Sequence, residues 1–164
     1  MRFRLLLHQL AIVFLAAACS SRPQAVAQQP VSDSAISFQR IFHAPFSGIE
    51  QRRRVVIRSA TELKTFWIEV AGPRMPPPEL PLVDFSESLV IAVAMGRRGT
   101  GGHDIRVDQV YRAGERIVVV VREISPGPSC MVTMGLTAPI DIVRIPRSED
   151  PVTFAENAET QECG

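Results

Sequence analysis

The chain has 164 residues, enough for one ordinary domain with a single hydrophobic core. Its formal net charge is +1, and without residues 1–18, which carry Arg2 and Arg4 but no acidic residue, 16 basic residues stand against 17 acidic ones. This near-neutral balance argues against a nucleic-acid partner, and the length argues against a second domain.

Residues 1–18 have the pattern of a cleaved signal peptide. The basic start Met-Arg-Phe-Arg is followed by apolar residues 5–7 and 10–18, which end in small side chains. A membrane-spanning helix needs about 20 apolar residues, and here His8 and Gln9 interrupt a run that is already too short. We therefore expect export from the cytoplasm and removal of this segment.

The signal pattern ends in a cysteine that is a candidate lipid anchor. Residues 15–19, Leu-Ala-Ala-Ala-Cys, resemble a bacterial lipobox, although Ala16 stands where Leu is commonest. Cys19 would then be diacylated and become the new N-terminus. The alternative is cleavage after Ala27, which would release a soluble periplasmic protein, but that site lies far from the apolar run. Ser20 in place of an Asp favours the outer membrane, with the protein facing the periplasm or the surface.

The next segment separates this anchor from the folded part. Residues 19–33 lack periodicity and large apolar groups, so we expect a flexible tether, with one domain over residues 34–164. The short β-branched run at residues 54–58 predicts a strand.

One helix is predicted after this strand. Ser59 and Glu62 have the spacing of a capping box, in which Ser59 accepts from the backbone amide of Glu62 and Glu62 reaches back. Apolar residues then recur at one helical face, and Gly72 followed by Pro73 ends the pattern. The residues on this face are Leu63, Phe66, Trp67 and Val70. We interpret Trp67 as a core residue and not as a ligand platform.

The remaining sequence is rich in β-strand patterns. The proline-rich residues 75–81 predict an extended connection, with recognition by a partner as the less favoured reading. Strands are predicted at residues 89–95, 105–111, 116–123, 131–136 and 140–145, with a short one at 152–154. Because the intervals are too short for crossover helices, we expect an α+β fold: a mostly antiparallel sheet of about five or six strands with the helix packed on it.

The glycine-rich residues 96–103 could be mistaken for a phosphate-binding loop. A strand follows them instead of a helix, and the Lys-Ser/Thr pair of a P-loop is missing. We interpret Gly96, Thr100, Gly101 and Gly102 as a structural turn, a hairpin that uses positive φ angles.

The inventory of metal-binding and acid–base residues is sparse. His43 and His103 are the histidines beyond the signal segment, and no spacing of histidines or cysteines predicts a metal site or requires a cofactor. Four carboxylates could in principle act as an acid–base pair, but their positions fit solvated strand faces better. They are Asp84, Glu87, Asp104 and Asp108.

Two cysteines remain beyond Cys19, and we expect Cys130 and Cys163 to form a disulfide because the compartment is oxidising. The alternative is a free Cys163 in a frayed tail. A second alternative is a nucleophile, Cys130 or Ser129, with His103 as its base, although residues 127–131 lack the second glycine of a nucleophile elbow.

Three short motifs in one order resemble the PrcB C-terminal domain family. They are Pro-Leu-Val-Asp-Phe-Ser at residues 81–86, Thr-Gly-Gly-His-Asp-Ile at 100–105 and Pro-Gly-Pro-Ser-Cys at 126–130, and the similarity spans residues 46–147. The family is named after an accessory subunit of a bacterial surface protease complex. The resemblance implies a small α+β domain and no enzymatic activity.

These observations lead to one main hypothesis and two alternatives. The main one is a non-catalytic envelope lipoprotein that binds an unidentified envelope protein, such as a protease, through the rigid loop of Pro126, Gly127, Pro128 and Ser129. The alternatives are a protease inhibitor that presents this loop as a pseudo-substrate, and a weak hydrolase.

Overall fold

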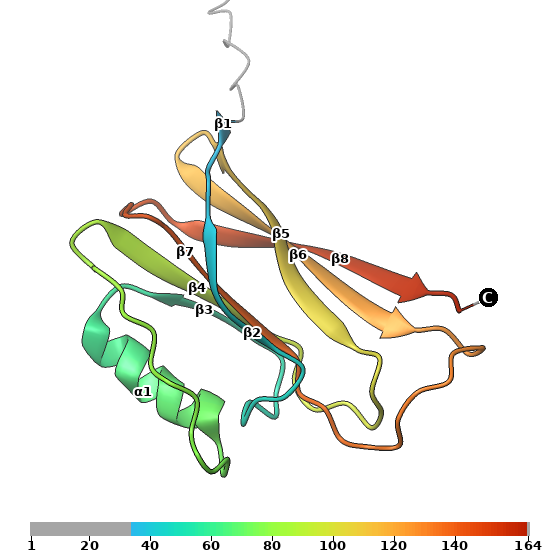
Figure 1. Ribbon diagram of the computed structural model, residues 1–164. Coiled ribbons are helices and arrows are strands. Elements are labelled where there is room, and N and C mark those ends of the chain that lie inside the picture. Colours follow the sequence, from blue (N-terminus) through green and yellow to red (C-terminus); the bar gives the residue numbers. More distant parts are fainter. Residues whose placement is uncertain (1–33, 164) are drawn as a thin grey trace, which may run out of the picture. The chain divides into compact units, whose positions relative to one another are not determined.

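The computed structural model describes residues 34–163, which form one helix and eight strands (Figure 1). In chain order they are β1 (Ser34–Ala35), β2 (Gln39–Ala44), β3 (Arg53–Ile57), α1 (Ala60–Ala71), β4 (Ser88–Ala94), β5 (Asp104–Ala113), β6 (Arg116–Pro126), β7 (Ile140–Pro146) and β8 (Val152–Gln161). Across these residues there is no helix long and apolar enough to cross a membrane.

The strands form two four-stranded sheets, one in the order β1-β5-β6-β8 and the other in the order β2-β7-β4-β3. Neighbouring strands pair antiparallel except β6 and β8, which are parallel. The expected α+β class with mostly antiparallel strands is confirmed. The expected number of strands, five or six in a single sheet, is too low, because the described residues form eight strands in two sheets.

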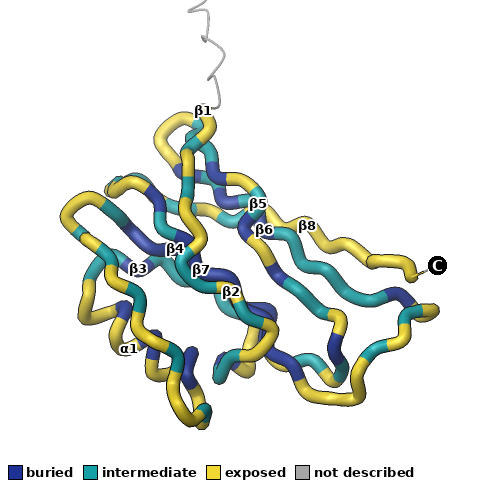
Figure 2. Tube along the Cα trace, in the orientation of Figure 1, coloured by how far each residue is buried: buried dark blue, intermediate teal, exposed yellow. Residues whose placement is uncertain are grey.

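Strand β4 explains why a second sheet is needed. Its side chains are buried on both faces: Leu89, Ile91 and Val93 pack between the two sheets, whereas Val90 and Ala92 pack toward α1. A strand that is apolar on both faces needs a cover on each of them. The result is three layers, with α1 on one side of the β2-β7-β4-β3 sheet and the β1-β5-β6-β8 sheet on the other (Figures 1 and 2).

Helix α1 forms where its local signals predict. The hydroxyl of Ser59 accepts a hydrogen bond from the backbone N–H of Glu62 at 3.2 Å, and the Glu62 carboxylate accepts one from the backbone N–H of Arg58 at 2.7 Å, one residue before the cap. Trp67 is buried as expected; its ring meets Phe42 edge-on at 4.9 Å and its Nε1 donates to the carbonyl of Pro78 at 2.9 Å.

Two predictions about the glycine-rich segment have different outcomes. Gly96 and Gly102 do have positive φ angles, of 77° and 81°. The segment does not close a hairpin, however, because β4 and β5 lie in different sheets. Residues 95–103 cross from one sheet to the other, and residues 127–139 cross back; we call these two segments the crossover loops.

The prediction of a strand at residues 131–136 is wrong. Three other strands were either not predicted or predicted too short. Residues 131–136 lie in the second crossover loop, where Met131, Met134 and Leu136 are exposed and find no partner strand. Strands β1 and β2 were not predicted, and β8 is longer than the predicted residues 152–154. Polar edge strands such as β8 are formed by pairing with a neighbour, so local hydrophobic alternation does not reveal them.

Candidate functional site

The two crossover loops lie side by side at the same end of the domain (Figure 1). Their backbones are joined at an isolated bridge, in which the N–H of Arg98 donates to the carbonyl of Thr137 at 2.8 Å and the N–H of Thr137 donates back at 3.0 Å. The hydroxyl of Thr137 also donates to the carbonyl of Thr100, at 2.8 Å. Thr100 therefore has its carbonyl held by the opposite loop.

The glycines of the first loop allow this close approach. The N–H of Gly101 donates to the carbonyl of Thr133 at 2.9 Å, and a Cβ at Gly101 would lie 2.3 Å from the Thr133 hydroxyl oxygen. A Cβ at Gly102 would lie 3.0 Å from a methyl carbon of Val132. Their role is thus to let two segments pack together, in addition to the turn geometry expected from the sequence.

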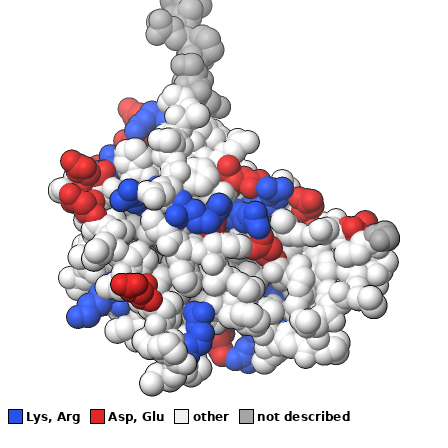
Figure 3. Space-filling model, viewed as in Figure 1, with Lys and Arg blue, Asp and Glu red and all other residues white. Residues whose placement is uncertain are grey.

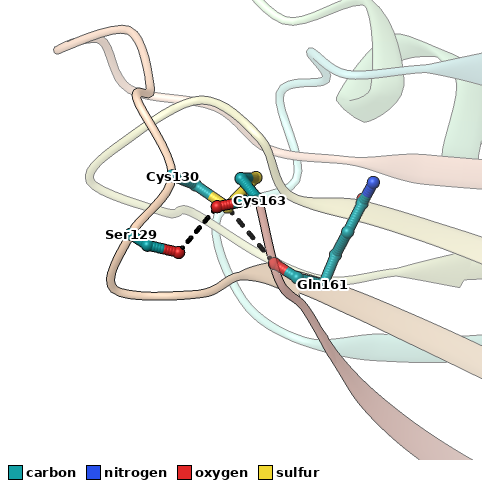
Figure 4. The surroundings of a disulfide bond; sticks show 4 residues. All are labelled: Ser129, Cys130, Gln161 and Cys163. Carbon is teal, nitrogen blue, oxygen red and sulfur yellow. Dashed lines mark hydrogen bonds between the residues drawn. A yellow bond between two sulfur atoms is a disulfide. The ribbon is translucent and has the colours of Figure 1, made fainter.

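A disulfide ties the second loop to the end of β8. Cys130 and Cys163 are bonded, as expected from the sequence (Figure 4). Around the bond, the Ser129 hydroxyl donates to the carbonyl of Cys163 at 3.0 Å, and the N–H of Gly127 donates to the carbonyl of Gln161 at 2.8 Å. The predicted interaction loop, Pro126 to Ser129, is therefore fixed at both ends.

Large apolar side chains remain exposed on this rigid framework. Met131 and Met134 are 101% and 91% exposed, and Leu136 and Phe46 are also exposed. Phe46 and Leu136 line a pocket of about 270 Å³ where the second crossover loop meets the residues before β3 and after α1. We call the exposed set Phe46, Met131, Met134 and Leu136 the apolar end.

The residues of the hydrolase hypothesis do not form an active-site arrangement. Cys130 is in the disulfide, and Ser129 donates to the Cys163 carbonyl. Nε2 of His103 lies 3.3 Å from the Thr100 hydroxyl oxygen, and its Nδ1 is buried without a hydrogen-bond partner among the described residues. Within residues 34–163, His103 makes no hydrogen bond to Ser129 or Cys130. Burial, together with the nearby charge of Arg98, lowers the pKa of His103.

The four candidate carboxylates are also separate from one another. Asp84 accepts from the backbone N–H and hydroxyl of Ser86, which lowers the pKa of Asp84. Asp104 pairs with His43 and Arg106, and Asp108 pairs with Arg122. Glu87 contributes its carbonyl, which accepts from the N–H of Arg147 at 2.8 Å.

Asp141, a buried carboxylate at the junction of the sheets, was missed by the sequence reasoning. Its side chain is fully buried in β7 and accepts from Arg40 at 2.7 Å and 3.1 Å and from the backbone N–H of Val107 at 2.8 Å. Irregular pairing at Arg40/Phe42 in β2 and at Val107/Gln109 in β5 accompanies these contacts. The available signal was a single Asp within the apolar run Pro-Ile-Asp-Ile-Val.

Charged side chains continue along the same junction. Nε2 of His43 lies 2.7 Å from a carboxylate oxygen of Asp104, which connects β2 to β5. Figure 3 shows a band of charged groups of both signs across this face. On another strand pair, Arg54 of β3 binds Glu156 of β8 through two contacts of 2.8 Å and also binds Glu123 of β6. These ion pairs join the two sheets. In the described residues, no group of three His, Cys, Asp or Glu side chains could hold a metal ion.

The fold and the site define a small α+β domain in which two hydrogen-bonded crossover loops expose apolar side chains. The candidate catalytic residues described above do not form an active-site arrangement. Residues 89–146 match the family described as PrcB C-terminal. The match runs from β4 to β7 and includes both crossover loops. No curated protein and no solved structure matches the chain.

Proposed function

We propose that this chain is a non-catalytic, envelope-anchored module for protein–protein interaction, accessory to a protease or another surface complex. The observation that carries the proposal is the construction of the crossover loops. Hydrogen bonds and the Cys130–Cys163 disulfide hold them in place, while Met131 and Met134 of the second loop stay fully exposed.

This construction suits binding for two physical reasons. A loop that is already ordered loses little conformational entropy on association, so more of the contact energy appears as affinity. Several exposed apolar side chains within a few residues of one loop are characteristic of interaction surfaces, and the flexible thioether side chains of Met131 and Met134 can adapt to a partner's shape.

The position of Ser34, where the described residues begin, supports the same reading. Strand β1 pairs at Ser34↔Arg112 and Ala35↔Tyr111, next to the turn between β5 and β6. The crossover loops begin at the opposite end of β5, a strand of 10 residues. At about 3.4 Å per residue, this places the loops roughly 30 Å from Ser34. An anchored domain would thus present the apolar end away from its attachment point.

The anchor itself belongs to the proposal. Cys19 and residues 1–33 lie outside the described residues, and we propose lipidation at Cys19 with outer-membrane localisation; release as a soluble periplasmic protein is the alternative. Labelled palmitate should be incorporated by the wild-type chain and not by Cys19→Ala. Mature Cys19→Ala protein that still fractionates with membranes would contradict the anchor.

Co-purification after crosslinking in intact envelopes tests the interaction. The wild-type chain should recover one stoichiometric partner, and the double variant Met131→Ser/Met134→Ser should lose it. Leu82→Ser is the matched control, because Leu82 is 95% exposed but lies outside both loops. Recovery of only abundant outer-membrane proteins, or equal recovery by both variants, would contradict the proposal.

The inhibitor alternative is favoured by the same disulfide, which would hold residues 126–130 as a rigid pseudo-substrate. Protease inhibition that is lost on reduction would support it. The hydrolase alternative is less well supported, because the Cys130 sulfur is bonded to Cys163 and His103 is hydrogen-bonded within its own loop.

A further inference from the structure

Strand β8 has an unusually long free edge. Among the described residues, β8 pairs with β6 on one side only, over a continuous register from Val152 to Gln161. The other outer strands are shorter or irregular: β1 has 2 residues, β3 has 5, and the pairing of β2 shifts between Arg40 and Phe42. Proteins usually protect a long edge with a bulge, a proline or lysines, and β8 has none of these within its length.

The hydrogen bonds to β6 show which backbone groups of β8 point outward. The N–H of Ile117 donates to the carbonyl of Pro151 and the N–H of Gly127 donates to that of Gln161, so odd-numbered residues of β8 face β6. Both polar backbone groups of one strand residue point to the same side. The free edge is therefore formed by the even-numbered residues Val152, Phe154, Glu156, Ala158 and Thr160.

We propose that this edge pairs with β8 of a second copy of the chain, antiparallel and around a two-fold axis at Asn157. A symmetric pairing is the natural way for one surface to bind itself. Each copy would add its four-stranded sheet to the other's, giving a continuous eight-stranded sheet. This inference concerns assembly and does not rest on the function of the crossover loops.

Charge selects this register. Two symmetric registers pair almost the whole strand, one centred on Glu156 and one on Asn157. The first places the Glu156 carboxylates of the two copies opposite each other, which is unfavourable. The second places Glu156 opposite Ala158, Ala155 opposite Glu159 and Phe154 opposite Thr160, with no like charges facing.

The charges already present on β8 do not oppose this pairing. Glu156 is bound within its own domain by Arg52 and Arg54, at 2.9 Å and 2.8 Å, and Glu159 lies 3.6 Å from Arg122. Each carboxylate therefore already has a cationic partner, and it keeps that partner in the Asn157 register, where no second carboxylate faces it. In the Asn157 register, Glu156 of each copy forms a hydrogen-bonded pair with Ala158 of the other copy, and Phe154 of each copy does so with Thr160 of the other. Each such pair exchanges two backbone hydrogen bonds.

An introduced cysteine tests the axis directly. In the Asn157 register the two copies of residue 157 form a non-hydrogen-bonded pair with Cα atoms about 4.5 Å apart, within the range of a disulfide. In the same register the two Thr153 positions lie roughly 27 Å apart. The full-length chain with Cys19→Ser, purified in mild detergent, should form a crosslinked dimer with Asn157→Cys and not with Thr153→Cys. Equal crosslinking of the two variants, or none in either, overturns the proposal.

A second pair of variants does not depend on an introduced thiol. Ala158→Pro removes an N–H that points outward and leaves the bonds to β6 in place, as proline on an edge strand permits. The native mass of the full-length chain should fall from dimer to monomer, whereas Ala158→Ser should remain dimeric. Circular dichroism checks that both variants fold. A wild-type chain that is monomeric at every soluble concentration, or a dimer that survives Ala158→Pro, overturns self-pairing and leaves the edge to another occupant.

Discussion

Asp141 of β7 and Arg40 of β2 form a two-point ion pair that also reaches the other sheet. The Arg40 Nε and Nη2 atoms lie 2.7 Å and 3.1 Å from the two carboxylate oxygens, one of which accepts the backbone N–H of Val107 in β5 at 2.8 Å. A single buried carboxylate thus accepts hydrogen bonds from both sheets.

Asp141→Ala should therefore be strongly destabilising. It leaves the buried N–H of Val107 without an acceptor and removes the partner of Arg40, so we expect the free energy of unfolding to fall by about 3 kcal/mol. Asp108→Ala, which removes a partly buried partner of Arg122, should cost at most about 1 kcal/mol. Urea denaturation of both variants measures the difference, and equal costs would argue against Asp141 as the connection between the sheets.

The disulfide should stabilise the loop more than the tail. Because β8 is already ordered by pairing with β6, replacing Cys130 and Cys163 by Ser should lower the free energy of unfolding by less than the usual 2–4 kcal/mol, at about 1–2 kcal/mol. Hydrogen exchange should accelerate at residues 127–136, while β5 and β6 stay protected. Fraying of the whole of β8 in this variant would show instead that the bond holds the tail.

Close packing between the crossover loops can be tested with two glycines that share a positive φ angle. Gly102 and Gly114 have φ angles of 81° and 61°, so alanine is strained at both. A Cβ at Gly102 also crowds Val132 and Pro126, whereas one at Gly114 meets nothing within 4 Å. Gly102→Ala should cost about 1–2 kcal/mol more than Gly114→Ala in thermal or urea unfolding. Equal costs would mean that the loops do not pack as described.

His103 should make stability depend on pH in the mildly acidic range. Burial, with the charge of Arg98, lowers the pKa of His103 in the folded chain. The unfolded chain then takes up its proton first, so the stabilising contribution is complete above about pH 6.5 and is lost as the pH falls through the lower folded pKa. His103→Gln should flatten the decline in urea midpoint between about pH 7 and pH 5. An unchanged slope in this variant would contradict the assignment.

The parts of the fold that follow from local signals could be predicted from the sequence, and the parts that follow from distant pairing could not. Helix α1 was predictable because its cap and its apolar face are both local, and β4 because its run is apolar throughout. Residues 131–136 carry an apolar pattern with no strand beside them, so the prediction failed there. The two-sheet arrangement and the parallel β6–β8 pair depend on contacts between residues far apart in the chain.

The candidate site shows the same division. The disulfide was predictable because two cysteines remain beyond the predicted signal segment, which is expected to lead into an oxidising compartment. The glycine-rich and Pro-Gly-Pro motifs did mark the loops that meet. Their mutual packing was not predictable, because a hairpin was the simpler explanation of the glycines. Asp141 was overlooked because a lone carboxylate within a strand pattern is usually a solvated residue.

Photo-crosslinking from the apolar end tests the central claim most directly. A photoreactive amino acid placed at Met134 in the full-length chain, irradiated in intact cells of its own organism, should give one dominant crosslinked partner identified by mass spectrometry. The same group at Leu82, which is equally exposed but outside the crossover loops, should give no such band. A dominant partner from Leu82 and none from Met134 would contradict an interaction site on the crossover loops.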